Sequence, residues 1–236
     1  PMAAIAQKMA AYVNNQKQKD LYSCLTGAFG SINANDSNSA LFDLCIDSES
    51  GDSPTVLSPR HVARAKALLG DQGEKLTTIA MHSNCYYDLV ERNAIDRIYD
   101  NTGAPDTAAA SGSTANAFPG TTSIPTFMGL RVIVSDDIPT TGSGASTEYS
   151  CFFFTGGAIV TGEQSPMRTQ TDRDILALEE AMAVDLHYIY HPVGLKYAVS
   201  TVNPNRSVLE TVASWSKVYE TKNIGIARAT IVSNND

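Results

Sequence analysis

A period-two alternation of apolar side chains runs from Met182 to Tyr190, and it constrains the fold of this chain more than any other feature. The even positions of the segment carry the large apolar or aromatic residues Met182, Val184, Leu186, Tyr188 and Tyr190. This period predicts a β-strand with one covered face. The residues just before it, 176–181, are strong helix formers. A long strand that overrides such a propensity is usually held by packing, often against a neighbouring subunit, so the segment favours a protein that builds an assembly over an enzyme.

Composition narrows the class of protein further. The chain has 236 residues, enough for one large domain or two small ones, and 43% of them are hydrophobic, as in proteins with a real core. Its formal net charge is −8 and its 17 lysines and arginines are scattered, so the sequence lacks the basic stripe of a tight nucleic-acid site. No apolar run approaches the roughly 20 residues that span a bilayer, so no membrane contact is expected. The four cysteines have neither disulfide-framework nor zinc spacing, and we expect them to be reduced.

Residues 3–29 are predicted to form one long helix. Apolar side chains recur at roughly helical spacing at Ile5, Met9, Val13, Leu21, Leu25 and Phe29. The polar run at 14–20 interrupts this stripe, so we expect the helix to lie on the surface or between neighbouring subunits rather than in the core. Gly27 and Gly30 supply its predicted C-terminal stop.

The rest of the chain alternates short helices and strands. A helix is predicted from Pro59 to Leu69 with Ser58 as its N-cap, and a second short helix is expected to be capped by Ser83. Strands are expected at 75–81, at 127–134, at 149–160 with Gly156-Gly157 as a break, and at 193–200, and the sequence closes on an apolar run at 224–232. Gly129 indicates a bulge within the second of these strands. Residues 101–123 are rich in small side chains and predict a mobile loop, so the whole pattern predicts a mixed α+β fold.

Two groupings of residues could carry chemistry. Cys85 lies near a predicted helix N-terminus beside His82, where a thiol can become a nucleophile, but packing at the end of a buried strand explains the same pattern. His187 and His191 share a strand face with Asp185, yet residues four apart along a strand are roughly 13 Å apart, too far to ligate one metal ion. No catalytic residue, metal ion or cofactor is therefore expected.

Charged residues around the long strand suggest a different role. They are Asp172, Arg173, Asp174, Glu179, Glu180 and Asp185. Such residues are commonly solvated. On a strand that needs outside packing, such charged residues favour a second interpretation. They would pair with basic residues of a neighbouring subunit and so select the register and the partner of the contact.

In their order along the chain, these pieces resemble the major capsid proteins of tailed double-stranded DNA phages, the Johnson or Hong Kong 97-like fold. The helix at 5–29 looks like the spine helix of that family, and residues 57–90 look like the helix, strand and helix that begin its axial domain. Residues 127–134, followed by an acidic turn and Pro139, are similar to its Gly-Leu/Arg-Val-Val strand. The long alternating segment looks like its peripheral-domain strand, and residues 191–194 look like the turn back into the axial domain. The likeness covers nearly the whole chain.

The resemblance implies an α+β, Hong Kong 97-like capsid subunit with two domains. The peripheral domain would be residues 1–30 and 165–191, with the spine helix and the long strand, and the mixed α/β axial domain would be residues 31–164 and 192–236. Copies of the chain would form pentamers and hexamers of an icosahedral shell in the virion, assembled in the host cytoplasm. The shell would enclose double-stranded DNA that its acidic wall contacts only weakly. Scaffolding, portal and decoration proteins would be further partners. The expected subunit-interface residues are Asp172, Arg173, Glu180, Arg131 and Asp137.

Alternatives to this interpretation stay open. The family's N-terminal arm and extended loop lie upstream of the spine helix and have no counterpart here, and the chain begins at Pro1, so we expect its leading part to have been removed or left out. That upstream segment also distinguishes phage capsids from encapsulin-like nanocompartment shells of the same fold, which enclose cargo enzymes. An intracellular enzyme that uses Cys85 and His82 is the third interpretation.

Overall fold

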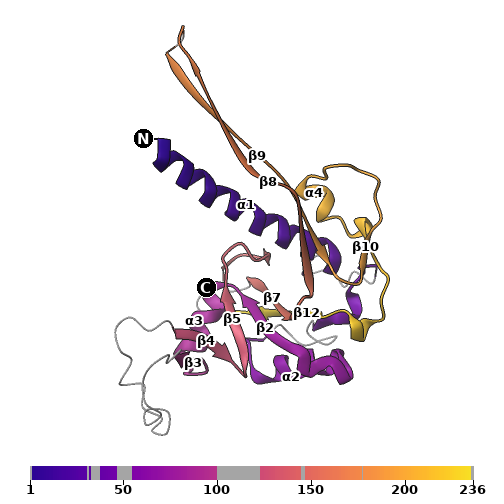
Figure 1. Cartoon of the computed structure of the whole chain (residues 1–236). Coiled ribbons are helices and arrows are strands. Elements are labelled where there is room, and N and C mark those ends of the chain that lie inside the picture. The colour runs from indigo at the N-terminus through magenta and orange to yellow at the C-terminus, as the bar shows by residue number, and fades with distance from the viewer. Residues whose placement is uncertain are drawn as a thin grey trace.

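The computed structural model describes residues 2–30, 32, 38–46, 55–99, 123–144, 147–176 and 178–234. Figure 1 shows a body built on a sheet, from which a long helix, α1 (Met2–Phe29), and a two-stranded arm project. The mixed α+β class expected from the sequence is confirmed. The loop predicted at 101–123 lies outside the described residues except for Ser123, which begins a strand.

One mixed sheet forms the centre of the body. Its strands are β1 (Cys45–Ile46), β2 (Leu76–Met81), β3 (Asp96–Tyr99), β4 (Ser123–Phe127), β5 (Leu130–Val134), β6 (Thr140–Thr141), β7 (Glu148–Thr155) and β12 (Ile226–Val232). They lie in the order β1-β12-β7-β2-β5-β4-β3, with β6 beside β7. β1 runs parallel to β12 and β2 parallel to β5, and the other pairs are antiparallel. The central strands β12, β7 and β2 are buried over most of their length, which explains their nearly continuous apolar sequences.

Short helices connect these strands, namely α2 (Pro59–Leu68), α3 (Ser83–Glu91) and the 3-10 helices η1 (Phe42–Leu44) and η2 (Gly70–Lys75). α2 begins as predicted after Ser58, whose amide donates a hydrogen bond to Nδ1 of His61 (3.2 Å), and it stops before Gly70. The predicted cap of α3 is wrong by one residue. His82 is the N-cap, and its Nδ1 accepts a hydrogen bond from the Asn84 amide (3.2 Å).

The predicted strand at 127–134 is two strands joined by a tight turn. β4 ends at Phe127 and β5 begins at Leu130, and the residues between them, Met128 and Gly129, have φ angles of 51° and 80°. Two consecutive positive φ angles are typical of a two-residue hairpin turn whose twist matches that of the strands. Gly129 therefore closes a hairpin, and the bulge expected there is wrong.

α1 is confirmed as one long helix, but its two ends have different surroundings. Gly30 stops it with a φ of 78°, whereas Gly27 lies inside the helix and is not part of the stop. Leu25, Ala28 and Phe29 are at most 1% exposed, so the C-terminal part of α1 belongs to the core of the body. The expectation of a helix outside the core is wrong for this part, because the polar run at 14–20 separates a projecting end from a buried one.

The arm consists of β8 (Ile159–Asp174) and β9 (Glu179–Pro192), which among the described strands pair only with each other. β9 confirms the strand predicted at 182–190. Its partner is an antiparallel strand of the same chain, so the neighbouring subunit expected to hold it is not needed for pairing. Of the helix formers before it, Leu176 and Leu178 lie in the turn and residues 179–181 begin β9, where cross-strand pairing overrides their propensity.

A smaller unit lies at the base of the arm. It contains β10 (Leu195–Tyr197), α4 (Arg206–Leu209), η5 (Val212–Ser214), β11 (Trp215–Lys217) and η6 (Thr221–Asn223). β10 pairs antiparallel with β11, and Trp215 is 5% exposed. Within the described residues, no helix combines the length and the apolar character that a membrane crossing requires.

Candidate functional site

The base of the arm is fixed to the polar middle of α1, residues 15–20, which we call the clamp. Tyr188 of β9 donates a hydrogen bond from its hydroxyl to the Asp20 carboxylate. Lys17 forms an ion pair with Glu163 of β8 (2.7 Å), and its Nζ lies 5.1 Å from the centre of the Tyr188 ring. Because Tyr188 and Glu163 are opposite each other in the ladder, the clamp holds both strands from one face.

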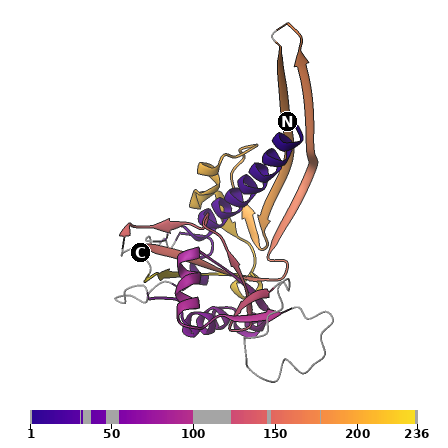
Figure 2. The same ribbon diagram turned by 90° about the vertical axis from the view of Figure 1, so that its left-hand side faces the viewer.

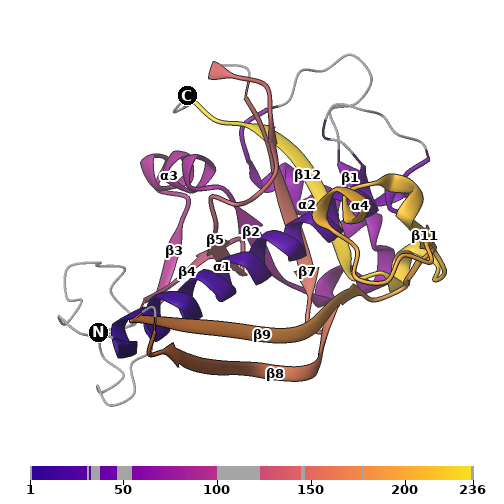
Figure 3. The same ribbon diagram turned by 90° about the horizontal axis from the view of Figure 1, so that it is seen from above.

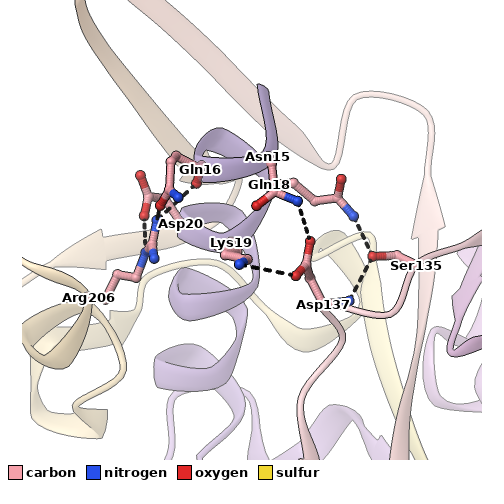
Figure 4. A network of polar contacts seen from close by, with 8 residues as sticks. All are labelled: Asn15, Gln16, Gln18, Lys19, Asp20, Ser135, Asp137 and Arg206. Atoms are coloured by element: carbon pink, nitrogen blue, oxygen red, sulfur yellow. Dashed lines mark hydrogen bonds and ion pairs between the residues drawn. The ribbon is translucent and has the colours of Figure 1, made fainter. Parts of the chain in front are cut away.

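The clamp also binds the body and the small unit, as Figure 4 shows. Arg206, the first residue of α4, donates from Nε to Asp20 (2.5 Å). On another side of α1, Asp137 accepts a hydrogen bond from Asn15 (3.4 Å) and lies 3.7 Å from Nζ of Lys19. The clamp therefore ties together the arm, the turn after β5 and the segment that carries α4. Sequence reasoning missed this role; the only signal was an unbroken polar run inside an otherwise amphipathic helix.

Burial around the clamp changes the acidity of several side chains. The pKa of Tyr188 is raised well above its usual value, first by burial and then by its hydrogen bond to the Asp20 carboxylate. Burial is also the main reason why the pKa values of Tyr190 and Tyr22 are raised. The Cys24 thiol has its pKa raised to about 12, by burial and then by the nearby Asp20 charge. All four groups are thus held in their neutral forms.

Alkaline pH is expected to lower the stability of the protein, because these groups ionise at lower pH in the unfolded chain than in the folded one. The unperturbed thiol has a pKa of 9.0, and the Cys24 thiol in the folded protein has a pKa of about 12. The contribution of neutral Cys24 to the free energy of unfolding is therefore complete below pH 9 and is lost as pH rises toward 12. We expect the urea midpoint, measured with reductant present, to fall steadily above pH 9. Cys24→Ala should flatten that fall between pH 9 and 11, and an unchanged slope in this variant would contradict the assignment.

Beyond the clamp, the arm projects with its tip free of the rest of the described chain (Figures 1 and 2). Three aliphatic side chains lie at the tip, where Ile175 is 78%, Leu176 97% and Leu178 80% exposed. Next to them, Arg173 of β8 lies opposite Glu180 of β9 in the ladder. An exposed apolar tip bordered by charges is unusual for a surface that only contacts water.

The structure brings together three of the five expected interface residues. Asp172, Arg173 and Glu180 lie side by side near the tip of the arm. Arg131 is exposed on β5, in the body, and Asp137 belongs to the contacts of the clamp within its own chain. The two body residues therefore do not form one surface with the three on the arm.

The grouping of Cys85 and His82 is a packing arrangement in this structure. Cys85 is 1% exposed, and its thiol interacts with that of Cys151, whose pKa is raised by burial and then by this contact. His82 uses Nδ1 to cap α3, and its Nε2 lies 3.8 Å from Oδ1 of Asp136. A hydrogen bond from Ser83 lowers the pKa of Asp136. Nothing in this arrangement opens the thiol to a substrate.

His187 and His191 do not form a metal site either. His191 is hydrogen-bonded through Nε2 to the Leu195 carbonyl oxygen (2.9 Å), and His187 lies on the exposed face of the arm. Across the part of the chain that the structure describes, no three His, Cys, Asp or Glu side chains are grouped in a way that could hold a metal ion.

Comparison with known proteins places the chain among viral shell proteins. Residues 2–225 match the family model Gp13-like, described as major capsid protein 13-like. The major capsid protein of Bacillus phage SPP1 is 28% identical over 233 residues, which cover 97% of this chain and 64% of that protein. The SrpI encapsulin of Synechococcus elongatus PCC 7942, solved as a holo complex, has a TM-score of 0.44 and 12% identity, over 97% of this chain and 64% of that one. The chain thus spans less than two thirds of the length of both proteins. Because the family model matches nearly all of its residues, the chain belongs to the Gp13-like family of major capsid proteins, as its resemblance to phage capsid proteins led us to expect.

Proposed function

We propose that the chain is a structural subunit of an icosahedral shell of a tailed phage, part of the virion and assembled in the host cytoplasm. The family match carries this proposal, and the projecting arm with its exposed apolar tip supports it. Identical copies would form pentamers and hexamers through contacts that close into rings. The shell subunit would work by assembly and have no catalytic activity.

The proposed fold is Hong Kong 97-like, with α1 as the spine helix. Residues 1–30 and 165–191 would form the peripheral domain, and residues 31–164 and 192–236 the axial domain. The arm supports this division because it stands apart from the sheet of the body, although its paired strands extend from Ile159 to Pro192. Figure 3, viewed from above, shows α1 crossing the body diagonally while β8 and β9 run along one of its edges.

Contacts between subunits would be made by the tip of the arm. Burying an aliphatic side chain contributes about 1.5–3 kcal/mol, so three at one tip provide a strong anchor. Asp172, Arg173 and Glu180 would border that anchor and select its partner, while Arg131 and Asp137 would lie at separate contacts. The net charge of −8 supports only weak contact with packaged double-stranded DNA. Scaffolding, portal and decoration proteins would be additional partners.

Electron microscopy and light scattering of the full-length protein test this function. We expect uniform icosahedral shells that hold DNA in the virion. Leu176→Asp should prevent or strongly weaken shell formation while leaving the free energy of unfolding within about 0.5 kcal/mol, because the residue is 97% exposed in the subunit.

Val202→Asp is the matched control, since Val202 is 85% exposed but lies in the segment between β10 and α4, away from the tip of the arm. It should assemble like the unchanged protein. Equal assembly of both variants would contradict the role of the tip. Small shells filled with protein would favour an encapsulin-like nanocompartment, and a stable monomer or dimer of the full-length protein would contradict both kinds of shell.

A further inference from the structure

The outer part of the arm is a two-stranded ribbon with two open edges. From Glu179 to His187, β9 pairs with β8 on one side, and on its other side no backbone hydrogen bond joins it to any described part of the chain. Figure 2 shows this part rising beyond the N-terminal end of α1. A lone two-stranded ribbon is marginally stable in water, and its free N–H and C=O groups are a template for another strand.

The two edges differ in their ability to accept a strand. β8 contains Pro166, which has no N–H, and its register shifts between Glu163 and Ser165 and again between Ser165 and Arg168. β9 has neither proline nor glycine between Glu179 and His187, and it pairs in unbroken register from Glu179 to Asp185. Since proline and bulges block edge pairing, the β9 edge is the one that can be extended.

We propose that the outer edge of β9 pairs antiparallel with β9 of a second copy, about a two-fold axis at Ala183. This inference rests on the proposed shell function, which supplies many copies of the chain. The pairing would join two arms into one four-stranded sheet that links two subunits. It is an isologous contact, in which each copy uses the same residues.

Charges along β9 favour this axis over axes at Glu180, Met182 and Asp185. Backbone groups of a strand alternate in direction, so a two-fold pairing of a strand with itself is centred on a residue. An axis at Glu180 or Asp185 would place an acidic residue against its own copy, and an axis at Met182 would place Glu179 against the partner's Asp185. An axis at Ala183 instead places Glu179 opposite the partner's His187, twice by symmetry. This axis also lets every residue from Glu179 to His187 pair with the partner strand.

The apolar face of the arm supports the same register. Met182, Val184 and Leu186 lie on one face of β9 and are only half-buried in the single chain. About an axis at Ala183, Met182 lies opposite the partner's Val184, so four apolar side chains meet at the centre, and Leu186 lies opposite the partner's Glu180 at each end. Cross-strand pairs of this kind stabilise a sheet by roughly 0.2–1 kcal/mol each.

Cysteine cross-linking of the full chain tests the pairing. In Ala183→Cys the two thiols would face each other at the axis, with Cα atoms about 4.5–5.5 Å apart, which suits a disulfide. Diamide, which oxidises two thiols to one disulfide, should convert this variant to a covalent dimer in assembled shells. Ala181→Cys is the control, because its two copies would be roughly 13 Å apart. We expect about tenfold more dimer from Ala183→Cys than from Ala181→Cys, since only the first pair meets disulfide geometry.

A second pair of substitutions covers the case in which Ala183→Cys does not assemble. Glu179→Cys combined with His187→Cys should cross-link, whereas each single substitution should not, because the two copies of either position would be roughly 26 Å apart. Shells with equal dimer yields in test and control variants would overturn the β9 pairing and leave the shell function intact. Failure of the unchanged protein to form any shell would overturn both.

Discussion

Gly27→Ala will destabilise the subunit by about 3 kcal/mol, although alanine is the better helix former by about 1 kcal/mol. Gly27 lies inside α1, where the helix crosses the small unit. A Cβ atom there would lie 1.9 Å from the Leu209 carbonyl oxygen and 2.7 Å from Nε1 of Trp215. It would therefore break the hydrogen bond that Trp215 donates to Leu209 (2.8 Å) and push α1 away from α4.

Urea unfolding of the unassembled chain measures this effect, and Trp215, the single tryptophan, reports it by fluorescence. Gly156→Ala is the matched control. Gly156 lies in the exposed turn between β7 and β8, and an added Cβ would meet no atom within 4 Å. The control should stay within about 0.5 kcal/mol of the unchanged protein. A Gly27→Ala protein as stable as the control would show that α1 and the small unit are less closely packed than described.

Asp20→Ala will lower the free energy of unfolding by about 2 kcal/mol and will loosen the contact between the base of the arm and α1. Removing the carboxylate leaves the Tyr188 hydroxyl and the Arg206 guanidinium without their shared acceptor. Side chains of Asp20 and Arg206 are 25% and 39% exposed, so solvent screening keeps the loss below that of a fully buried pair. Urea unfolding gives the free-energy change, and limited proteolysis of the arm should speed up.

Two controls accompany this experiment. One removes only the charge of Asp20, and the other removes an exposed ion pair elsewhere on the chain. Asp20→Asn keeps an acceptor for Tyr188 but removes the charge, so its cost should be smaller. Glu74→Ala removes the ion pair between Glu74 and Lys66. Because the Glu74 side chain is 86% exposed, this substitution should change the free energy of unfolding by less than about 1 kcal/mol. If Asp20→Ala matched Glu74→Ala in both readouts, the clamp would contribute nothing to holding the arm.

Periodicity in the sequence predicted the elements whose own residues determine them. The alternation in β9 and the helical spacing in α1 each need only a local pattern, and both were confirmed. β8 was missed as a long strand because it carries Gly162, Pro166 and several charged residues, which weaken its own strand propensity. Its extended form comes from pairing with β9, which no local pattern reveals.

The clamp could not be predicted for a similar reason. Asp20 and Arg206 are 186 positions apart, and a polar run on a helix is normally solvated. Only the fold brings α4 and the arm to that side of α1. The exposed tip was not predicted, because the sequence showed only charged residues at 172–174 and 179–180 beside a run of helix formers and gave no sign of a turn between two paired strands. Family membership, in contrast, was carried by the order of the motifs along the whole chain.

The position of β12 in the sheet has a consequence for synthesis on the ribosome. β12 comprises residues 226–232, yet it lies between β1 and β7 and supplies a central strand of the body. α1 and the arm precede β12 in the chain, and the sheet beneath them lacks this central strand until residues 226–232 have been synthesised. A nascent or truncated chain would then lack the rigid base that orients the arm. Strand order thus makes the presence of residues 226–232 a condition for a body that can hold α1 and the arm in place.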